Sequence, residues 1–177
     1  MWKTIFFTAL IISCVSGHAG SSGVAAGALQ MSEKEDDQRG GPDWQDLGLA
    51  QQLAAEQGLM ILIFFEAEWC GICRRLESEV FTDPAVLQKL GKSYVPVMID
   101  VDSKSPQWFN GQKLSVRQLA QQFNVSAVPS LLFVDDAGEV MAHHTGFIPT
   151  ERMASLLAFI ASDSFGRQSF EEFQERH

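Results

Sequence analysis

Two cysteines separated by two residues, directly after an apolar run of strand length, constrain the fold of this chain more than any other feature. Cys70 and Cys73 follow the run from Leu59 to Phe65 and precede a segment with helical spacing of its apolar residues. At a helix N-terminus, unpaired backbone N–H groups and the helix dipole lower the pKa of a thiol. We therefore expect Cys70 to be a nucleophile near neutral pH and Cys73, about one turn further on, to resolve the mixed disulfide that Cys70 forms.

The size and charge of the chain limit what it can be. With 177 residues, of which 46% are hydrophobic and 20% charged, it has enough material for one globular domain with tails. The formal net charge of −9 argues against nucleic acid and anionic membrane surfaces as partners, because both would repel an acidic protein.

Residues 1–19 have the features of a signal peptide. Lys3 gives a positive start, and the apolar stretch after it is too short to span a bilayer. Cleavage after the small residues 17–19 would release the protein into the periplasm. Alternatively, residues 11–14 resemble the lipobox of bacterial lipoproteins, and the protein would then be anchored to the membrane through a lipid on Cys14. We favour the first route because the second leaves an unusually short signal.

Only two of the three cysteines, Cys70 and Cys73, fall in the predicted folded domain. Export places them in an oxidising compartment, where disulfides form and persist. A pair this close in sequence closes too short a loop to constrain the unfolded chain much, so it is a poor structural crosslink. The pair therefore indicates redox chemistry.

The order of the predicted elements indicates an α/β fold with a central mixed sheet flanked by helices. Residues 20–41 are rich in Gly, Ser, Ala and charges, which predicts a flexible linker, and residues 42–177 form the domain with a helical extension at its C-terminus. The predicted helices are 43–57 with Asp43 as cap, one after Cys70, one begun by Pro84 with Thr82 or Asp83 as cap, 116–123 with Ser115 as cap, 151–161 with Thr150 as cap, and a last one that begins with a capping box at Ser169. The predicted strands are 59–65, 94–101, and the hairpin of 130–134 with 139–145.

Residues 102–113 are polar and contain Pro106 and Gly111, which predicts a long loop. Trp108 and Phe109 are bulky and apolar in a segment that should lie at the surface. We expect both to fold back onto the core, and a patch that faces a partner is the alternative.

Several motifs together resemble the thioredoxin superfamily over about residues 44–161. More closely they are similar to exported bacterial thioredoxin-like proteins of the SoxW type and to the C-terminal domain of DsbD reductases. The motifs are Trp69-Cys70-Gly71-Ile72-Cys73, Phe81-Thr82-Asp83-Pro84-Ala85-Val86, Val125-Ser126-Ala127-Val128-Pro129-Ser130, and the glycines Gly138 and Gly146.

The resemblance implies a thioredoxin-like fold, protein disulfides as substrates, a membrane electron donor of the DsbD type and no cofactor. It also implies a cis peptide bond between Val128 and Pro129, beside the thiols. Because proline has no N–H, an extended substrate strand can pair with the backbone of the preceding residue. Trp69, Gly71 and Ile72 complete the expected substrate-binding surface.

One position departs from the family pattern. Thioredoxins bury an acidic residue six positions before the first cysteine, where it serves proton transfer to the resolving thiol, and here that position is Phe64. Glu66 and Glu68 are the remaining candidates for proton transfer. On an extended strand both would point to the same side, so one environment could serve both. We favour the other interpretation, in which both glutamates belong to a solvated strand end.

The expected function is that of an exported thiol–disulfide oxidoreductase, with a redox-silent binding module or metal carrier on the same fold as the alternative. Gly71 and Ile72 lack the Pro of thioredoxin and the His of strong oxidants, which favours a moderately reducing protein. We expect no metal site, since His143 and His144 are adjacent on a predicted strand and point to opposite faces.

Overall fold

The computed structural model describes residues 40–176. The predicted signal peptide, with Cys14, and nearly all of the predicted linker lie outside these residues. Within residues 40–176, no helix combines the length and the apolar character that a membrane crossing requires.

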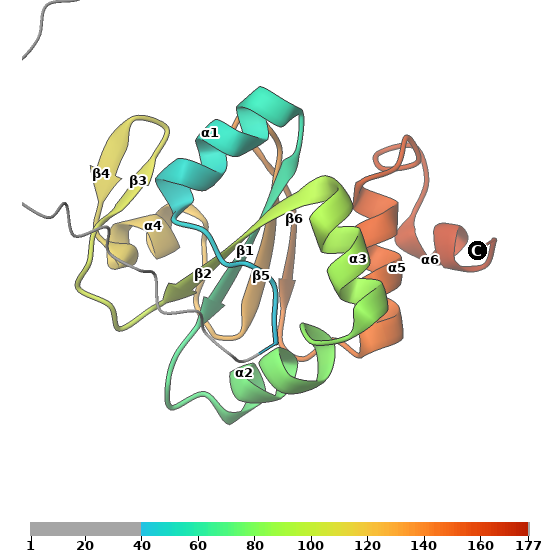
Figure 1. The fold of residues 1–177 in the computed structure, drawn as a ribbon, viewed down its shortest axis with the longest axis horizontal. Coiled ribbons are helices and arrows are strands. Elements are labelled where there is room, and N and C mark those ends of the chain that lie inside the picture. Colours follow the sequence, from blue (N-terminus) through green and yellow to red (C-terminus); the bar gives the residue numbers. More distant parts are fainter. Residues whose placement is uncertain (1–39, 177) are drawn as a thin grey trace, which may run out of the picture. The chain divides into compact units, whose positions relative to one another are not determined.

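A four-stranded mixed sheet forms the centre of the domain (Figure 1). Its strands are β1 (Met60–Glu66), β2 (Tyr94–Asp100), β5 (Ser130–Val134) and β6 (Val140–Thr145), in the order β2-β1-β5-β6. β1 is parallel to β2 and antiparallel to β5, and β5 is antiparallel to β6. The expected α/β fold with a mixed central sheet is confirmed.

Helices cover both faces of this sheet, and each face has its own hydrophobic cluster. α1 and α4 contribute to one cluster, and α2, α3 and α5 contribute to the other (Figure 1). Successive side chains of β1 point into the two clusters in turn. Both faces of the strand are therefore buried, which explains why its apolar run is unbroken. The helical segments are α1 (Leu47–Gln57), α2 (Gly71–Arg75), the π-helical η1 (Leu76–Val80), α3 (Pro84–Ser93), α4 (Val116–Gln122), α5 (Thr150–Ile160) and α6 (Phe170–Gln174).

The first helix begins later than predicted, with Asp46 rather than Asp43 as its cap. The Asp46 carboxylate accepts hydrogen bonds from the backbone N–H groups of the next turn, and Gly58 ends the helix with a φ of 65°. The preceding residues stay extended because the Gln45 N–H donates to the Pro96 carbonyl at the edge of the sheet, 2.9 Å away. Gln45 also forms a parallel bridge with Val97 of β2, so its backbone is extended and the helix begins after it.

The prediction of a loop at 102–113 was wrong, because this segment contains a hairpin. β3 (Gln107–Phe109) and β4 (Gln112–Leu114) are joined by Asn110 and Gly111, which both have positive φ, as a two-residue hairpin turn requires. Phe109 is buried, as expected. Trp108, contrary to expectation, is 52% exposed.

The predicted starts of most other helices are confirmed by side-chain caps at their N-termini. Asp83 caps α3, and Ser115 and Ser169 each form a capping box, at α4 and α6 respectively. α5 differs slightly, because Thr150 is its first residue and Pro149 is the N-cap. The Thr150 hydroxyl instead donates to the backbone carbonyl of Glu79 at 3.3 Å.

Candidate active site

The Cys70–Cys73 disulfide lies where β1 gives way to α2, as predicted. Cys70 is the N-cap residue of α2, and its Sγ accepts a hydrogen bond of 3.1 Å from the backbone N–H of Cys73. Cys70 is 6% exposed, whereas Cys73 is fully buried. Solvent therefore reaches Cys70 and not Cys73, and a backbone donor that stabilises negative charge points at the more accessible sulfur.

The residues beside Cys70 present apolar surface to solvent. Trp69 is 69% exposed and Ile72 is 52% exposed, and Gly71 between the cysteines is exposed as well. The indole N–H of Trp69 donates to the Asp102 carboxylate at 2.7 Å, so the ring is held in place despite its exposure. Large apolar side chains held at a surface are typical of contact sites for other proteins.

The predicted substrate-binding loop has a fixed backbone. The peptide bond between Val128 and Pro129 is cis, and Val128 packs against the hydrophobic cluster that contains both cysteines. The Pro129 carbonyl accepts a hydrogen bond of 2.9 Å from the N–H of Gly146. The buried hydroxyl of Ser130 donates to the carbonyl of Ala127 at 2.8 Å, which closes the loop on itself.

The two glutamates proposed for proton transfer do not share one extended strand, because β1 ends at Glu66. Glu66 is half-buried, and its carbonyl accepts a hydrogen bond from the N–H of Val101. Glu68 lies in the turn before the cysteines, where its side chain is exposed and its carbonyl accepts from the guanidinium of Arg74. Glu66 and Glu68 therefore differ in position and exposure, and their role in proton transfer stays a prediction.

Two further acidic residues lie near this turn, and the sequence analysis missed them. Asp100 and Asp102 line a hollow of about 340 Å³ together with Glu68 and Trp69. Asp100 is opposite Glu66 in the register of β1 and β2. Because parallel strands end at the same edge of a sheet, the acidic ends of 60–66 and 94–100 were the signal that could have placed them together.

Phe64 occupies the position of the missing buried acid and is fully buried. Its ring centroid lies 6.0 Å from that of Trp44 and 5.2 Å from that of Phe81. It belongs to the same hydrophobic cluster as Cys70 and Cys73. The environment behind the cysteines is therefore aromatic at this position.

Of the two adjacent histidines, His143 is exposed and His144 is half-buried, as expected for neighbours on a strand. The Nε2 atom of His144 is buried without a hydrogen-bond partner, and this burial lowers the pKa of the imidazole. Among residues 40–176, no group of three or more His, Cys, Asp or Glu side chains is arranged to hold a metal ion.

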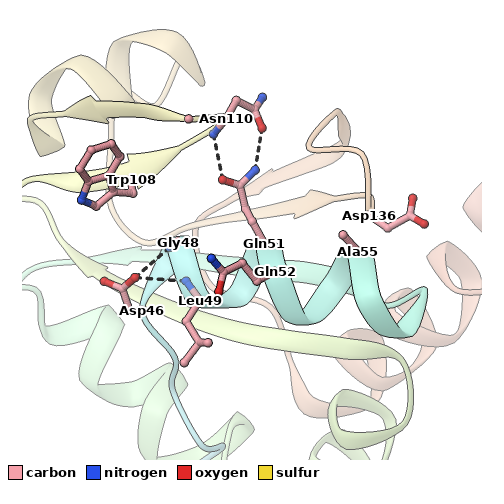
Figure 2. A pocket seen from close by; sticks show the side chains of 10 residues that line it. Asp46, Gly48, Leu49, Gln51, Gln52, Ala55, Trp108, Asn110 and Asp136 are labelled. Carbon is pink, nitrogen blue, oxygen red and sulfur yellow. Dashed lines mark hydrogen bonds between the residues drawn. The ribbon is translucent and has the colours of Figure 1, made fainter.

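A separate hollow lies between α1 and the β3–β4 hairpin and contains none of the predicted site residues (Figure 2). Gln51 of α1 and Asn110 of the hairpin face each other there and exchange two hydrogen bonds, of 2.6 and 2.9 Å. These bonds fix the hairpin on α1, with the ring of Trp108 at the rim of the hollow.

A mixed sheet between helices, with a CxxC disulfide at the start of the helix that follows β1 and a cis proline before β5, defines a thioredoxin-fold protein. Residues 47–161 match the Thioredoxin-like domain family, and the chain belongs to this family.

The curated relatives that the chain matches include thiol:disulfide interchange proteins named DsbD. The protein from Actinobacillus pleuropneumoniae is 32% identical over 111 residues, which is 62% of this chain and 18% of the relative. The protein from Salmonella typhi is 32% identical over 102 residues, which is 56% of this chain and 16% of the relative. The chain therefore spans less than a fifth of the length of these relatives.

Solved structures of the same fold include a thioredoxin-fold protein from Helicobacter pylori, with a TM-score of 0.59, 16% identity, and coverage of 67% of this chain and 80% of that one. A thioredoxin from Thermus thermophilus has a TM-score of 0.57 and 25% identity, with coverage of 71% and 91% respectively. The expected membership of the thioredoxin superfamily, with similarity to DsbD, is confirmed.

Proposed function

We propose that this protein is an exported thiol–disulfide oxidoreductase that reduces disulfides in other proteins. The observation that carries the proposal is the Cys70–Cys73 disulfide at the start of α2, with the more accessible sulfur accepting a backbone hydrogen bond. Membership of the thioredoxin-like family and similarity to the DsbD proteins support the same class of reaction.

The reaction balances without a cofactor. In the reduced protein, the Cys70 thiolate attacks one sulfur of a substrate disulfide, and the other substrate sulfur leaves as a thiolate. The Cys73 thiolate then attacks Cys70 Sγ, which releases the second substrate thiolate and forms the Cys70–Cys73 disulfide. Two electrons pass to the substrate, and the described structure corresponds to the oxidised protein that results.

The proposed substrate-binding surface has two parts, Trp69, Gly71 and Ile72 on one side and Val128 and Pro129 on the other. The exposure of Trp69 and Ile72 and the packing of Val128 on the cluster of the cysteines support this assignment. An extended substrate segment would pair with the backbone before Pro129 and place its disulfide at Cys70.

Proton transfer to or from Cys73 is assigned to solvent, Glu66 or Glu68, since Phe64 cannot carry a proton. The half-buried position of Glu66 at the end of β1 supports it as the first candidate. Glu68 is exposed and is the second.

Reduction of the Cys70–Cys73 disulfide requires a dithiol donor, and we propose a membrane protein of the DsbD type. The signal features of residues 1–19 support action in the periplasm after cleavage of the signal. Anchoring through a lipid on Cys14 is the alternative route.

The test of the proposed function has two parts. The first measures insulin-disulfide reduction with dithiothreitol as electron source, where the Cys70→Ser variant must be inactive. The second measures the reduction potential by equilibration with glutathione. A reductase is expected near the value of thioredoxin, roughly −270 mV, and a value near roughly −120 mV would instead indicate an oxidase.

A further inference from the structure

The proposed substrate-binding surface is built from two separate parts of the chain, and one short segment contacts both. The parts are α2, which carries the cysteines, and the loop that ends at Pro129. Gly146, directly after β6, donates its N–H to the Pro129 carbonyl at 2.9 Å. The next residue, Phe147, lies with its ring centroid 4.2 Å from the guanidinium carbon of Arg75, the last residue of α2.

Arg75 is held from its other side as well. Its Nε donates to both carboxylate oxygens of Glu79, at 2.9 and 3.0 Å, within η1. The backbone carbonyl of Glu79 in turn accepts the hydroxyl of Thr150 at the start of α5. A guanidinium between a carboxylate and an aromatic face has little freedom, and these contacts join α2 and η1 to the segment from Gly146 to Thr150.

The backbone changes from α-helical to π-helical between Arg75, the last residue of α2, and Leu76, the first residue of η1, so the contacts of Arg75 hold the helical segment at the point of this change. Phe147 is half-buried and packs against the cluster that contains both cysteines. Its ring therefore links the core beneath the disulfide to the exposed side chain of Arg75.

We propose that Phe147 is a positioning residue that holds α2, through Arg75, at a fixed distance from the Pro129 loop. Substrate proteins, which contact both parts, then meet a preformed surface. The inference rests on the proposed function and assigns to that site a residue outside the CxxC and Val-Pro motifs. A small disulfide, which needs only the Cys70 thiolate, gains nothing from this arrangement.

The chain supplies a matched control on the other side of α5. The guanidinium carbon of Arg152 lies 5.0 Å from the ring centroid of Phe170, and its Nη2 lies 3.8 Å from a carboxylate oxygen of Glu171. This is the same set of three side chains, and its members lie on α5 and α6. The Arg152→Met variant therefore loses an equivalent interaction away from the cysteines.

The test compares Phe147→Ala, Phe147→Leu, Arg75→Met and Arg152→Met in the pre-reduced protein. We expect the rate of oxidation by insulin to fall about two- to fivefold in Phe147→Ala and Arg75→Met. The rate with a small aromatic disulfide should stay unchanged in both, and Phe147→Leu, which keeps apolar bulk, should recover part of the insulin rate. Arg152→Met should match the parent protein with both oxidants.

Hydrogen exchange of individual amides provides a readout that does not depend on activity. The Gly146 amide and the amides of α2 should exchange faster in Phe147→Ala and not in Arg152→Met. Unchanged exchange in Phe147→Ala, or equal loss of rate with both oxidants, would overturn the inference. If the parent protein reduces neither oxidant while these amides still respond to Phe147→Ala, the proposed function fails and the positioning role stands.

Discussion

The backbone N–H of Cys73 donates a hydrogen bond to the Sγ of Cys70 across 3.1 Å, at the first turn of α2. In the same turn Cys70 is 6% exposed and Cys73 is fully buried. A donor aimed at a sulfur stabilises its thiolate, so the two thiols of the reduced protein differ in both access and charge. The proposed roles of the two cysteines, attack by Cys70 and resolution by Cys73, rest on this difference.

Phe64→Asp tests whether an acid behind the cysteines is the missing proton acceptor. The variant should resolve mixed disulfides faster at neutral pH but lose about 3–5 kcal/mol of unfolding free energy, because a buried ring is removed and a carboxyl group is buried. Burial raises the pKa of the new carboxyl group, so the variant should lose further stability as the pH rises above about 4.

The matched control is Phe65→Asp, since Phe65 is equally buried on the same strand but belongs to the cluster on the opposite face. It should be destabilised to a similar degree without any gain in the resolving rate. A gain in both variants would show that loosening of the fold, rather than the acid, speeds the reaction.

Glu66→Gln and Glu68→Gln test the two candidate bases. If Glu66 accepts the proton of Cys73, the resolving step of Glu66→Gln slows and its pH–rate profile loses one ionisation, as measured by stopped-flow fluorescence. Glu68→Gln should then leave the profile as it was. Unaltered profiles in both variants would assign the proton to water and contradict a glutamate role.

His144 should make stability depend on pH. Burial lowers its pKa in the folded protein, so the unfolded chain binds more protons at mildly acidic pH. The unfolding free energy is therefore highest above about pH 6.5, the pKa of a histidine in the unfolded chain. It falls as the pH drops towards the lower pKa that His144 has in the folded protein. The unfolding free energy, measured with urea at several pH values from about 5 to about 8, should depend less steeply on pH in His144→Leu than in the parent protein. An equally steep dependence on pH in His144→Leu and in the parent protein would contradict this account.

Gly138 should tolerate substitution less well than Gly111, although both have positive φ. A Cβ on Gly138 would lie 2.5 Å from the Oδ1 of Asn110, whereas a Cβ on Gly111 would meet nothing within 4 Å. Gly111→Ala should therefore cost about 1 kcal/mol of unfolding free energy from its backbone alone, and Gly138→Ala clearly more. When Asn110→Ala is the reference protein, adding Gly138→Ala should cost only about as much as Gly111→Ala does in the parent protein. Equal costs for the two alanines would contradict the close contact.

Features with a strong local signal were predicted well from the sequence. The CxxC pair at the strand-to-helix junction, the cap at Asp83 and the hairpin that begins at Ser130 depend on neighbouring residues, and the structure confirms them. The Asn110-Gly111 turn carried such a signal too, but its flanking strands have only three residues each, too short to show an alternating pattern.

Features that depend on distant parts of the chain were not predicted. The start of α1 shifts because Gln45 pairs with β2, far along the sequence. Asp100 comes close to the turn before the cysteines only because β1 and β2 are parallel and in register. The contact between Phe147 and Arg75 likewise joins the segment between β6 and α5 to the end of α2, and no local pattern encodes it.

The most direct test of the central claim, that Cys70 attacks substrate disulfides and Cys73 resolves them, is capture of mixed disulfides. The Cys73→Ser variant, pre-reduced and mixed with oxidised insulin, should accumulate a covalent adduct that mass spectrometry places on Cys70 and that dithiothreitol releases. The Cys70→Ser variant should accumulate none at the site, because Cys73 is buried. Adducts on Cys73 in Cys70→Ser, with none in Cys73→Ser, would contradict the account.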